Sequence, residues 1–379
     1  MYTTIGIHMK IIKRYVTVVL CTLLLSIQCM AIEQIPQANQ EESKAWQKHI
    51  DTIRQQFMIK GAIMGIWKKY PDGREAFWTG ASGDMKADDT FRIASITKIF
   101  TASLIMQLVE KKELALNDPI SKFGFKVKNA DKITIRHLLD HTNGLPHLNS
   151  RVMNSINRDH KKPLSPQEVV NLADTIQPNE LGKHSYTNTG YIIAGLIIEK
   201  ITGHSWEEHL KQQITEKYQL TATRLQQVGE EQSFPAWKKT SAGDVIKETD
   251  FVHPQLLWSS GMLVSNITDI VRFGRLMVQE KIVSGETLLR MSKPEHFSFM
   301  FGENIKIQHG MGLFSAEAPN YTLIGHGGDL PGLSSWLGWT TKTQDGSTYV
   351  VSGMFNQTGP GSNGPVAAVL MASLLDSQN

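Results

Sequence analysis

The chain has 379 residues, of which 41% are hydrophobic and 20% are charged, and its formal net charge at pH 7 is +3. This composition excludes an intrinsically disordered chain and allows one large domain or two closely joined ones. The first 31 residues hold three basic and no acidic side chains, so the remainder carries 39 − 3 = 36 basic against 36 acidic residues. Without an excess of positive charge, the chain is not expected to bind nucleic acid.

The first 31 residues predict a secretory signal peptide. Three basic residues precede an apolar run at 15–25, and the small residue Ala31 ends the segment at a cleavage site. The apolar run is too short to span a bilayer comfortably. We therefore expect residues 32–379 to form the mature protein, periplasmic or secreted, with no stable membrane span.

Two details of this segment bear on the mature chain. Met9 begins a more usual signal sequence, MKIIKR, so translation starts at either Met1 or Met9. Both cysteines, Cys21 and Cys29, lie in the segment that would be removed. The mature chain is thus expected to have neither a disulfide nor a thiol nucleophile.

Strand patterns cluster at the two ends of the chain. Alternating aromatic and apolar residues flank the turn sequence Pro71-Asp72-Gly73, and a second pair of such segments flanks residues 344–346. A further short strand is predicted just upstream of the second pair. The predicted strands are 62–70, 74–80, 321–325, 334–341 and 347–354.

Helical patterns fill the stretch between the two groups of strands. The simplest arrangement is an α+β fold, in which the first and last segments form one antiparallel sheet that carries an inserted, mostly helical subdomain. We place the sheet subdomain at about 43–94 and 300–379 and the helical subdomain at about 95–299. N- and C-terminal amphipathic helices at 43–57 and 366–375 would flank the sheet. The predicted internal helices are 98–109, 135–139, 166–173, 189–201, 205–214 and 268–278.

The stretch FRIASITKIFTA at 91–102 places a lysine in an apolar setting. Ser95 and Lys98 are three residues apart, so on a helix their side chains share a face. A hydroxyl and an amine placed in this way are a candidate nucleophile and base. Burial lowers the pKa of an amine, which would let Lys98 accept a proton. The pair alone is weak evidence, because composition would give about one or two serines followed by lysine at this spacing.

Two further motifs follow in the chain. Tyr186 and Asn188 precede an apolar helix, and Asn188 or Thr189 is placed to cap it, so a capping turn beside a buried tyrosine is the structural interpretation. His326 lies at the end of a predicted strand and is followed by two glycines. Glycines there would let a substrate backbone lie close to the strand edge.

Taken in order, these motifs resemble those of a known superfamily. SITK at 95–98, YTN at 186–188 and HGG at 326–328 are similar to the S-x-x-K, Y-x-N and H-x-G elements of the serine β-lactamase and penicillin-binding protein superfamily. The similar branch contains class C β-lactamases and DD-peptidases. Two more segments, LLDHTNGLPH at 138–147 and SSGMLVSNITDIVRFG at 259–274, resemble structural stretches of that branch. The resemblance covers most of the mature chain and implies a β-lactamase/transpeptidase-like fold.

The resemblance also implies a role for each motif. Ser95 would attack a carbonyl, while Lys98 and Tyr186 would share its proton and pass it to the leaving group. A tyrosine beside a cation is expected to have a lowered pKa, and which of the two side chains is the base stays open. The backbone N–H groups of Ser95 and Asp329 would form an oxyanion hole. The residues expected to bind substrate are Asn188, His326, Gly327, Gly328 and Asp329.

The function implied is that of an exported serine hydrolase that forms an acyl-enzyme and needs no cofactor. D-alanyl-D-alanine peptides are the leading substrates, in a carboxypeptidase-like reaction. Many β-lactamases carry lysine where this chain has His326 and a hydroxyl residue where it has Gly327, so recognition of a substrate carboxylate would be weaker. An esterase, a D-amino-acid amidase and a weak class C-like β-lactamase are therefore alternatives. A non-catalytic penicillin-binding sensor is less consistent with an intact Ser95, Lys98 and Tyr186.

No sequence pattern predicts a metal site. His204 and His209 are five residues apart, whereas the metalloprotease motif H-E-x-x-H requires four. His141 and His147 flank the turn Gly144-Leu145-Pro146. We expect these two histidines to bond local backbone groups, the alternative being a position at the mouth of the site.

Overall fold

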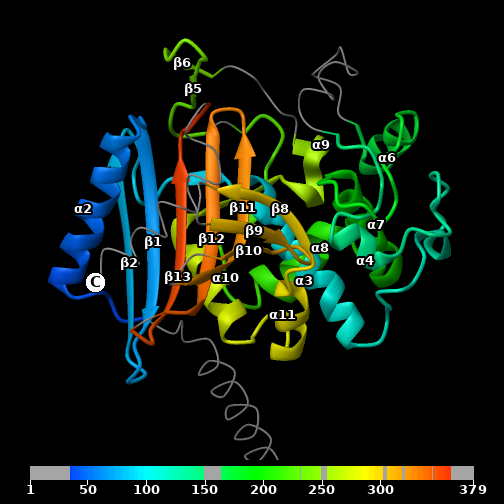
Figure 1. The fold of residues 1–379 in the computed structure, drawn as a ribbon, viewed down its shortest axis with the longest axis horizontal. Coiled ribbons are helices and arrows are strands. Elements are labelled where there is room, and N and C mark those ends of the chain that lie inside the picture. Colours follow the sequence, from blue (N-terminus) through cyan, green and yellow to red (C-terminus); the bar gives the residue numbers. More distant parts are fainter. Residues whose placement is uncertain are drawn as a thin grey trace, which may run out of the picture. The chain divides into compact units, whose positions relative to one another are not determined.

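The computed structural model describes residues 35–148, 164–230, 232–248, 254–301, 305–317, 321–343 and 345–359. Its largest element is an eight-stranded antiparallel sheet (Figure 1). The strands are β1 (Gly61–Lys69), β2 (Glu75–Gly83), β8 (His296–Phe301), β9 (Ile305–His309), β10 (Phe314–Glu317), β11 (Thr322–Leu330), β12 (Leu333–Lys342) and β13 (Thr348–Phe355).

The strand order shows how the two ends of the chain meet. It runs β2-β1-β13-β12-β11-β10-β9-β8, so the first strand of the chain pairs with one of the last. Gly65 of β1 lies opposite Ser352 of β13 in this pairing. The predicted closure of the sheet by the first and last segments is thus confirmed.

Helices cover both faces of the sheet. α2 (Gln40–Gln56) packs its fully buried Trp46 into an apolar cluster on one face, and α10 (Ile267–Val278) packs on the other. A Cβ added to Gly65 would lie 2.7 Å from a methyl group of Val271, so glycine lets α10 approach the sheet closely. Because side chains of β1 alternate between two covered faces, eight of its nine residues are buried instead of every second one.

The helical part of the chain is built around one central helix. α3 (Thr97–Glu110) has eleven of its fourteen residues buried, so even its polar side chains lie inside the protein. It contacts α7 and α8, while α7 also packs against α4 and α6. These helices are α4 (Ile135–Leu139), α6 (Pro166–Asp174), α7 (Thr189–Thr202) and α8 (Trp206–Leu210), and α9 (Pro254–Leu257) and α11 (Gly285–Ser292) follow later in the chain.

Two three-stranded sheets complete the described secondary structure. One has the order β3-β7-β4 and the other β14-β5-β6. Their strands are β3 (Thr90–Arg92), β4 (Arg224–Leu225), β7 (Leu263–Asn266), β5 (Trp237–Lys239), β6 (Val245–Lys247) and β14 (Gln357–Thr358). In the first, β3 ends just before Ser95 and is paired with the strand that follows Ser260.

The structure differs from the sequence-based expectations in several places. β8, β9 and β10 were not predicted, and the helix expected at 205–214 is α8 followed by a π-helical turn at Lys211–Thr215. α10 packs on the sheet although it falls within the range 95–299. β11 extends to Leu330, so His326 lies within a strand and not at its end. Its glycines do not break the strand because β12 pairs with every one of them.

Two predicted segments, 1–31 and 366–375, lie outside the described residues. Within the described part of the chain, every helix is too short or too polar to cross a membrane.

Candidate active site

Ser95 lies on a short 3₁₀ turn, Ala94–Ile96, that leads into α3. Ala94 has a φ of 47°, in the left-handed region that a residue with a Cβ seldom adopts. β11 runs directly alongside this turn. A Cβ added to Gly328 would lie 2.8 Å from the Ser95 backbone nitrogen and 2.6 Å from the Ile93 carbonyl oxygen. Glycine is therefore needed at this position for the strand to lie against the nucleophile.

Lys98 is fully buried on the first turn of α3. Its Nζ lies 3.1 Å from Ser95 Oγ, 2.8 Å from Asn188 Oδ1 and 2.7 Å from the Ser260 carbonyl oxygen. The predicted Ser95–Lys98 pair is thus brought together, and Asn188 joins it. Sequence analysis missed Ser260, which contributes a backbone carbonyl and so carries no signal in its side chain.

The three contacts of Lys98 fit a neutral amine. Burial lowers the Lys98 pKa well below its usual range. A neutral amine has two N–H donors and one lone pair, and the two shortest contacts are to Asn188 and Ser260 oxygens that only accept. The third partner, the Ser95 hydroxyl, is the one able to donate. The lone pair of Lys98 is therefore left facing the proton of Ser95.

Tyr186 lies on the other side of Ser95 and hydrogen-bonds to it. The expectation of a lowered Tyr186 pKa is wrong: burial raises the pKa, and the nearby Asp329 carboxylate adds to the effect. Lys98 Nζ lies over the face of the Tyr186 ring, 4.9 Å from its centroid. At neutral pH Tyr186 is thus a protonated phenol, able to donate a proton but unsuited to be the resting base.

Asn188 fixes Lys98 and does not cap a helix. Its backbone occupies the N-cap position of α7, but its side chain makes no capping hydrogen bond. Oδ1 accepts from Lys98, and Nδ2 donates to the Leu148 carbonyl oxygen at 3.0 Å. Both ends of the amide are therefore engaged, so the predicted contact with a substrate amide would require one of these bonds to be exchanged.

His326 is 1% exposed and lies in the middle of β11. Its Nδ1 is 2.5 Å from the Gly327 carbonyl oxygen, which only accepts, so Nδ1 carries the proton. Nε2 is then a lone-pair acceptor, and it has no hydrogen-bond partner among the described residues. Burial lowers the His326 pKa to about 3. At neutral pH His326 offers an acceptor and no positive charge.

Further histidine rings surround Tyr186. The centroid of His141 lies 4.3 Å from that of Tyr186, His147 lies at 5.8 Å and His309 at 6.2 Å. His141 Nδ1 also accepts the Thr187 N–H at 3.3 Å, so it both bonds a local backbone group and reaches the site. Burial lowers the pKa of His147 to about 4 and that of His309 to about 2, and it lowers the His141 pKa further below its usual value. The wall around Tyr186 is thus built from neutral imidazoles.

Ser335 on β12 joins the strand at the site to the nucleophile turn. Its Oγ lies 3.0 Å from the Ile93 carbonyl oxygen and 3.3 Å from that of Gly328. Sequence analysis missed this residue, because a single buried serine belongs to no motif. The oxyanion hole predicted from the N–H groups of Ser95 and Asp329 stays a prediction.

Sequence comparison links the chain to known proteins. The Beta-lactamase family model matches residues 50–376. The chain is 28% identical over 275 residues to penicillin-binding protein 4* of Bacillus subtilis, covering 67% of this chain and 58% of that protein. It is 23% identical over 269 residues to penicillin-binding protein 4 of Amycolatopsis lactamdurans, covering 64% and 65%. A teichoic acid D-alanine hydrolase of Staphylococcus aureus is 28% identical over 194 residues, covering 50% and 45%. The chain thus spans less than two thirds of the length of these relatives.

Structural comparison identifies the fold. A D-amino acid amidase from Ochrobactrum anthropi SV3 has a TM-score of 0.74 at 24% identity, covering 89% of this chain and 99% of that one. A penicillin-binding protein homologue from Pyrococcus abyssi has a TM-score of 0.70 at 24% identity, covering 89% and 78%. At this identity the likeness concerns the fold, and it confirms the predicted α+β architecture.

The neutral Lys98 amine predicts the pH dependence of acylation. Since only the neutral form accepts the Ser95 proton, the rate of labelling by a fluorescent penicillin should be constant above the lowered Lys98 pKa and fall about tenfold per pH unit below it. Lys98→Ala should lower the labelling rate by about 10²–10⁴-fold, and the remaining rate should no longer fall at low pH in this way. A rate that keeps rising up to about pH 10, the ordinary lysine pKa, would contradict the assignment.

Proposed function

The chain belongs to the Beta-lactamase family, and we propose that it is an exported serine hydrolase of the D-alanyl-D-alanine carboxypeptidase type, acting through an acyl-enzyme at Ser95. This proposal rests on the contact of 3.1 Å between Lys98 Nζ and Ser95 Oγ, in which a buried neutral amine faces a hydroxyl. The penicillin-binding proteins among its sequence relatives support the same reaction class.

The proposed reaction moves one proton through the two residues beside Ser95. Lys98 accepts the proton of Ser95 as its Oγ attacks the substrate carbonyl carbon. The N–H groups assigned to the oxyanion hole stabilise the negative oxygen, a contribution of about 3 kcal/mol per donor. Tyr186 donates its proton to the leaving amine as the carbon–nitrogen bond breaks, and it regains a proton from Lys98. Water then hydrolyses the ester on Ser95 by the reverse sequence of proton transfers.

A second candidate function is hydrolysis of D-amino-acid amides or esters. It is favoured by the neutral form of His326, in which Nε2 is a hydrogen-bond acceptor. A peptide ending in D-alanine brings a carboxylate, which only accepts hydrogen bonds, whereas His326 Nε2 is also an acceptor. Asp329 adds negative charge close to Tyr186. An amide substrate offers N–H donors to Nε2, and an ester carries no charge to be repelled.

The acyl-enzyme is tested by labelling with a fluorescent penicillin and mapping the adduct by mass spectrometry. We expect the label on Ser95 and expect Ser95→Ala to lose it while keeping its thermal stability, since alanine is small and favours helix. Ser103→Ala is a matched control, because it removes another buried hydroxyl, on α3, whose Oγ contacts Met277 Sδ at 3.7 Å, and it leaves the nucleophile in place. Labelling of Ser95 without turnover of any peptide, amide or ester would instead indicate a binding module.

The two substrate classes are separated by one pair of compounds. We expect an acyl-D-alanyl-D-alanine peptide to be turned over with a lower kcat/KM than its C-terminal amide, because His326 is neutral between pH 5 and 8. His326→Lys should raise the peptide-to-amide ratio by about tenfold, since the carboxylate of the bound peptide favours the protonated form of the new amine beside it. A native enzyme that prefers the carboxylate, increasingly so towards pH 5, would show that His326 acts in its charged form.

Export rests on the three basic residues and the apolar run of the N-terminal segment. N-terminal sequencing of the native protein should find a chain that begins near Ile32 and is recovered outside the cytoplasm. An uncleaved cytosolic chain beginning at Met1 or Met9 would refute export without affecting the catalytic assignment.

A further inference from the structure

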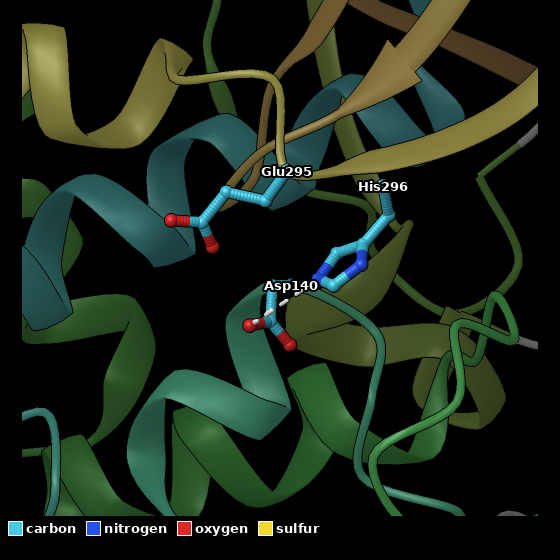
Figure 2. Close-up of side chains that lie close together, drawn as sticks. All are labelled: Asp140, Glu295 and His296. Atoms are coloured by element: carbon cyan, nitrogen blue, oxygen red, sulfur yellow. Dashed lines mark ion pairs between the residues drawn. The ribbon is translucent and has the colours of Figure 1, made fainter.

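A second cluster of side chains, of types that bind metal ions, lies between the end of α4 and β8, the strand at one edge of the eight-stranded sheet. Asp140 follows the last residue of α4, Glu295 precedes β8, and His296 is the first residue of that strand (Figure 2). One carboxylate oxygen from each acid and one ring nitrogen of the histidine lie within 4.8 Å of one another. None of these residues contributes to the arrangement of Ser95, Lys98 and Tyr186.

Asp140 is the fixed member of the cluster. The residue is 2% exposed, and its Oδ1 accepts hydrogen bonds from the Thr142 N–H at 3.1 Å and the Thr142 hydroxyl at 2.6 Å. Its other oxygen, Oδ2, lies 3.8 Å from His296 Nε2, which is too far for a hydrogen bond. A buried carboxylate is thus oriented by Thr142 with one oxygen directed at an imidazole that it does not reach.

Glu295 is held only loosely by its basic neighbours. Its two carboxylate oxygens lie 3.4 Å and 3.5 Å from Arg136 Nη1, and one lies 3.9 Å from Lys293 Nζ. Charge-assisted hydrogen bonds between such groups are normally about 2.7–2.9 Å long. The side chains of Glu295 and His296 are 24% and 26% exposed, so an ion can reach both from solvent.

We propose that Asp140, Glu295 and His296 bind a divalent transition-metal ion of the zinc type. Zn²⁺ takes imidazole nitrogen and carboxylate oxygen as ligands, and three protein ligands leave a fourth position for water. Ligand atoms around a tetrahedral zinc ion are about 3.3 Å apart, given bonds of about 2.0–2.1 Å. The gap between Asp140 and His296 therefore has to close by only about 0.5 Å, a movement open to the half-buried His296 side chain.

The surroundings of His296 support its role as a ligand. The ring of His184 stacks on it with centroids 5.6 Å apart, and His184 Nε2 is in turn 2.6 Å from His309 Nδ1. This stack limits the orientations of the His296 ring, as outer partners of metal-binding histidines do. A bound ion would tie the end of α4 to β8, and it would stabilise the folded protein by mass action.

The test is titration of the purified protein with ZnCl₂ by calorimetry at pH 7.5, with Co²⁺ as a spectroscopic probe of coordination. We expect one ion per chain, visible cobalt absorption of a low-coordinate site, and a rise in the unfolding temperature. His296→Ala and Glu295→Gln should each weaken binding by about 10–100-fold.

His204→Ala is the matched control, because His204, which precedes α8, lies 3.5 Å from Glu208 with both side chains exposed, and this pair has no third metal ligand within reach among the described residues. The His204→Ala variant should change the affinity for Zn²⁺ less than twofold. The Ser95→Ala variant should bind Zn²⁺ as the native protein does. The proposal is overturned by the absence of stoichiometric binding, by unchanged affinity in His296→Ala and Glu295→Gln, or by an equal loss in His204→Ala. Because the readout is binding, failure here and failure of the hydrolase assignment are distinguishable.

Discussion

The site depends on one constraint, the removal of the Lys98 amine from water. An amine in this position is stable only if its donors find acceptors inside the protein, since an unpaired buried polar group is costly. Asn188 and Ser260 supply those acceptors from α7 and from the turn before β7. The lone pair that results is directed at Ser95, so the packing that excludes water also prepares the nucleophile.

Several distant segments are needed to meet this constraint. α3 is buried on nearly all sides, which its apolar sequence requires and which leaves Lys98 no route to solvent. The ring centroids of Tyr186 and Tyr191 lie 4.9 Å and 5.5 Å from Lys98 Nζ. β11 closes the remaining side, where Gly328 touches the nucleophile turn. Helical and sheet regions therefore share one site that neither contains alone.

The predictable part of the structure is the part encoded in local patterns. The β1–β2 and β12–β13 hairpins follow from turn residues and alternation, and the helices at Lys98 and Thr189 follow from apolar runs. The catalytic motifs were found because Ser95 and Lys98 are neighbours on a helix. Ser260, Ser335 and the orientation of Asn188 were not predictable, because their roles arise from contacts between residues that are 90 to 242 positions apart in the chain. The raised Tyr186 pKa was missed for a related reason: burial disfavours the phenolate and also leaves Lys98 neutral, and burial is a property of the assembled fold.

The strand order has a consequence for the order in which the parts of the site can assemble. β1 is completed on one side only by β13, which lies almost three hundred residues later, and β11, the strand beside Ser95, follows that serine by more than two hundred residues. Pairings so distant in sequence form slowly, since a long loop must close before the contact is gained. A growing chain can therefore assemble its helices while its reactive serine still lacks one wall. The site around Ser95 is therefore complete only once these long-range pairings have formed.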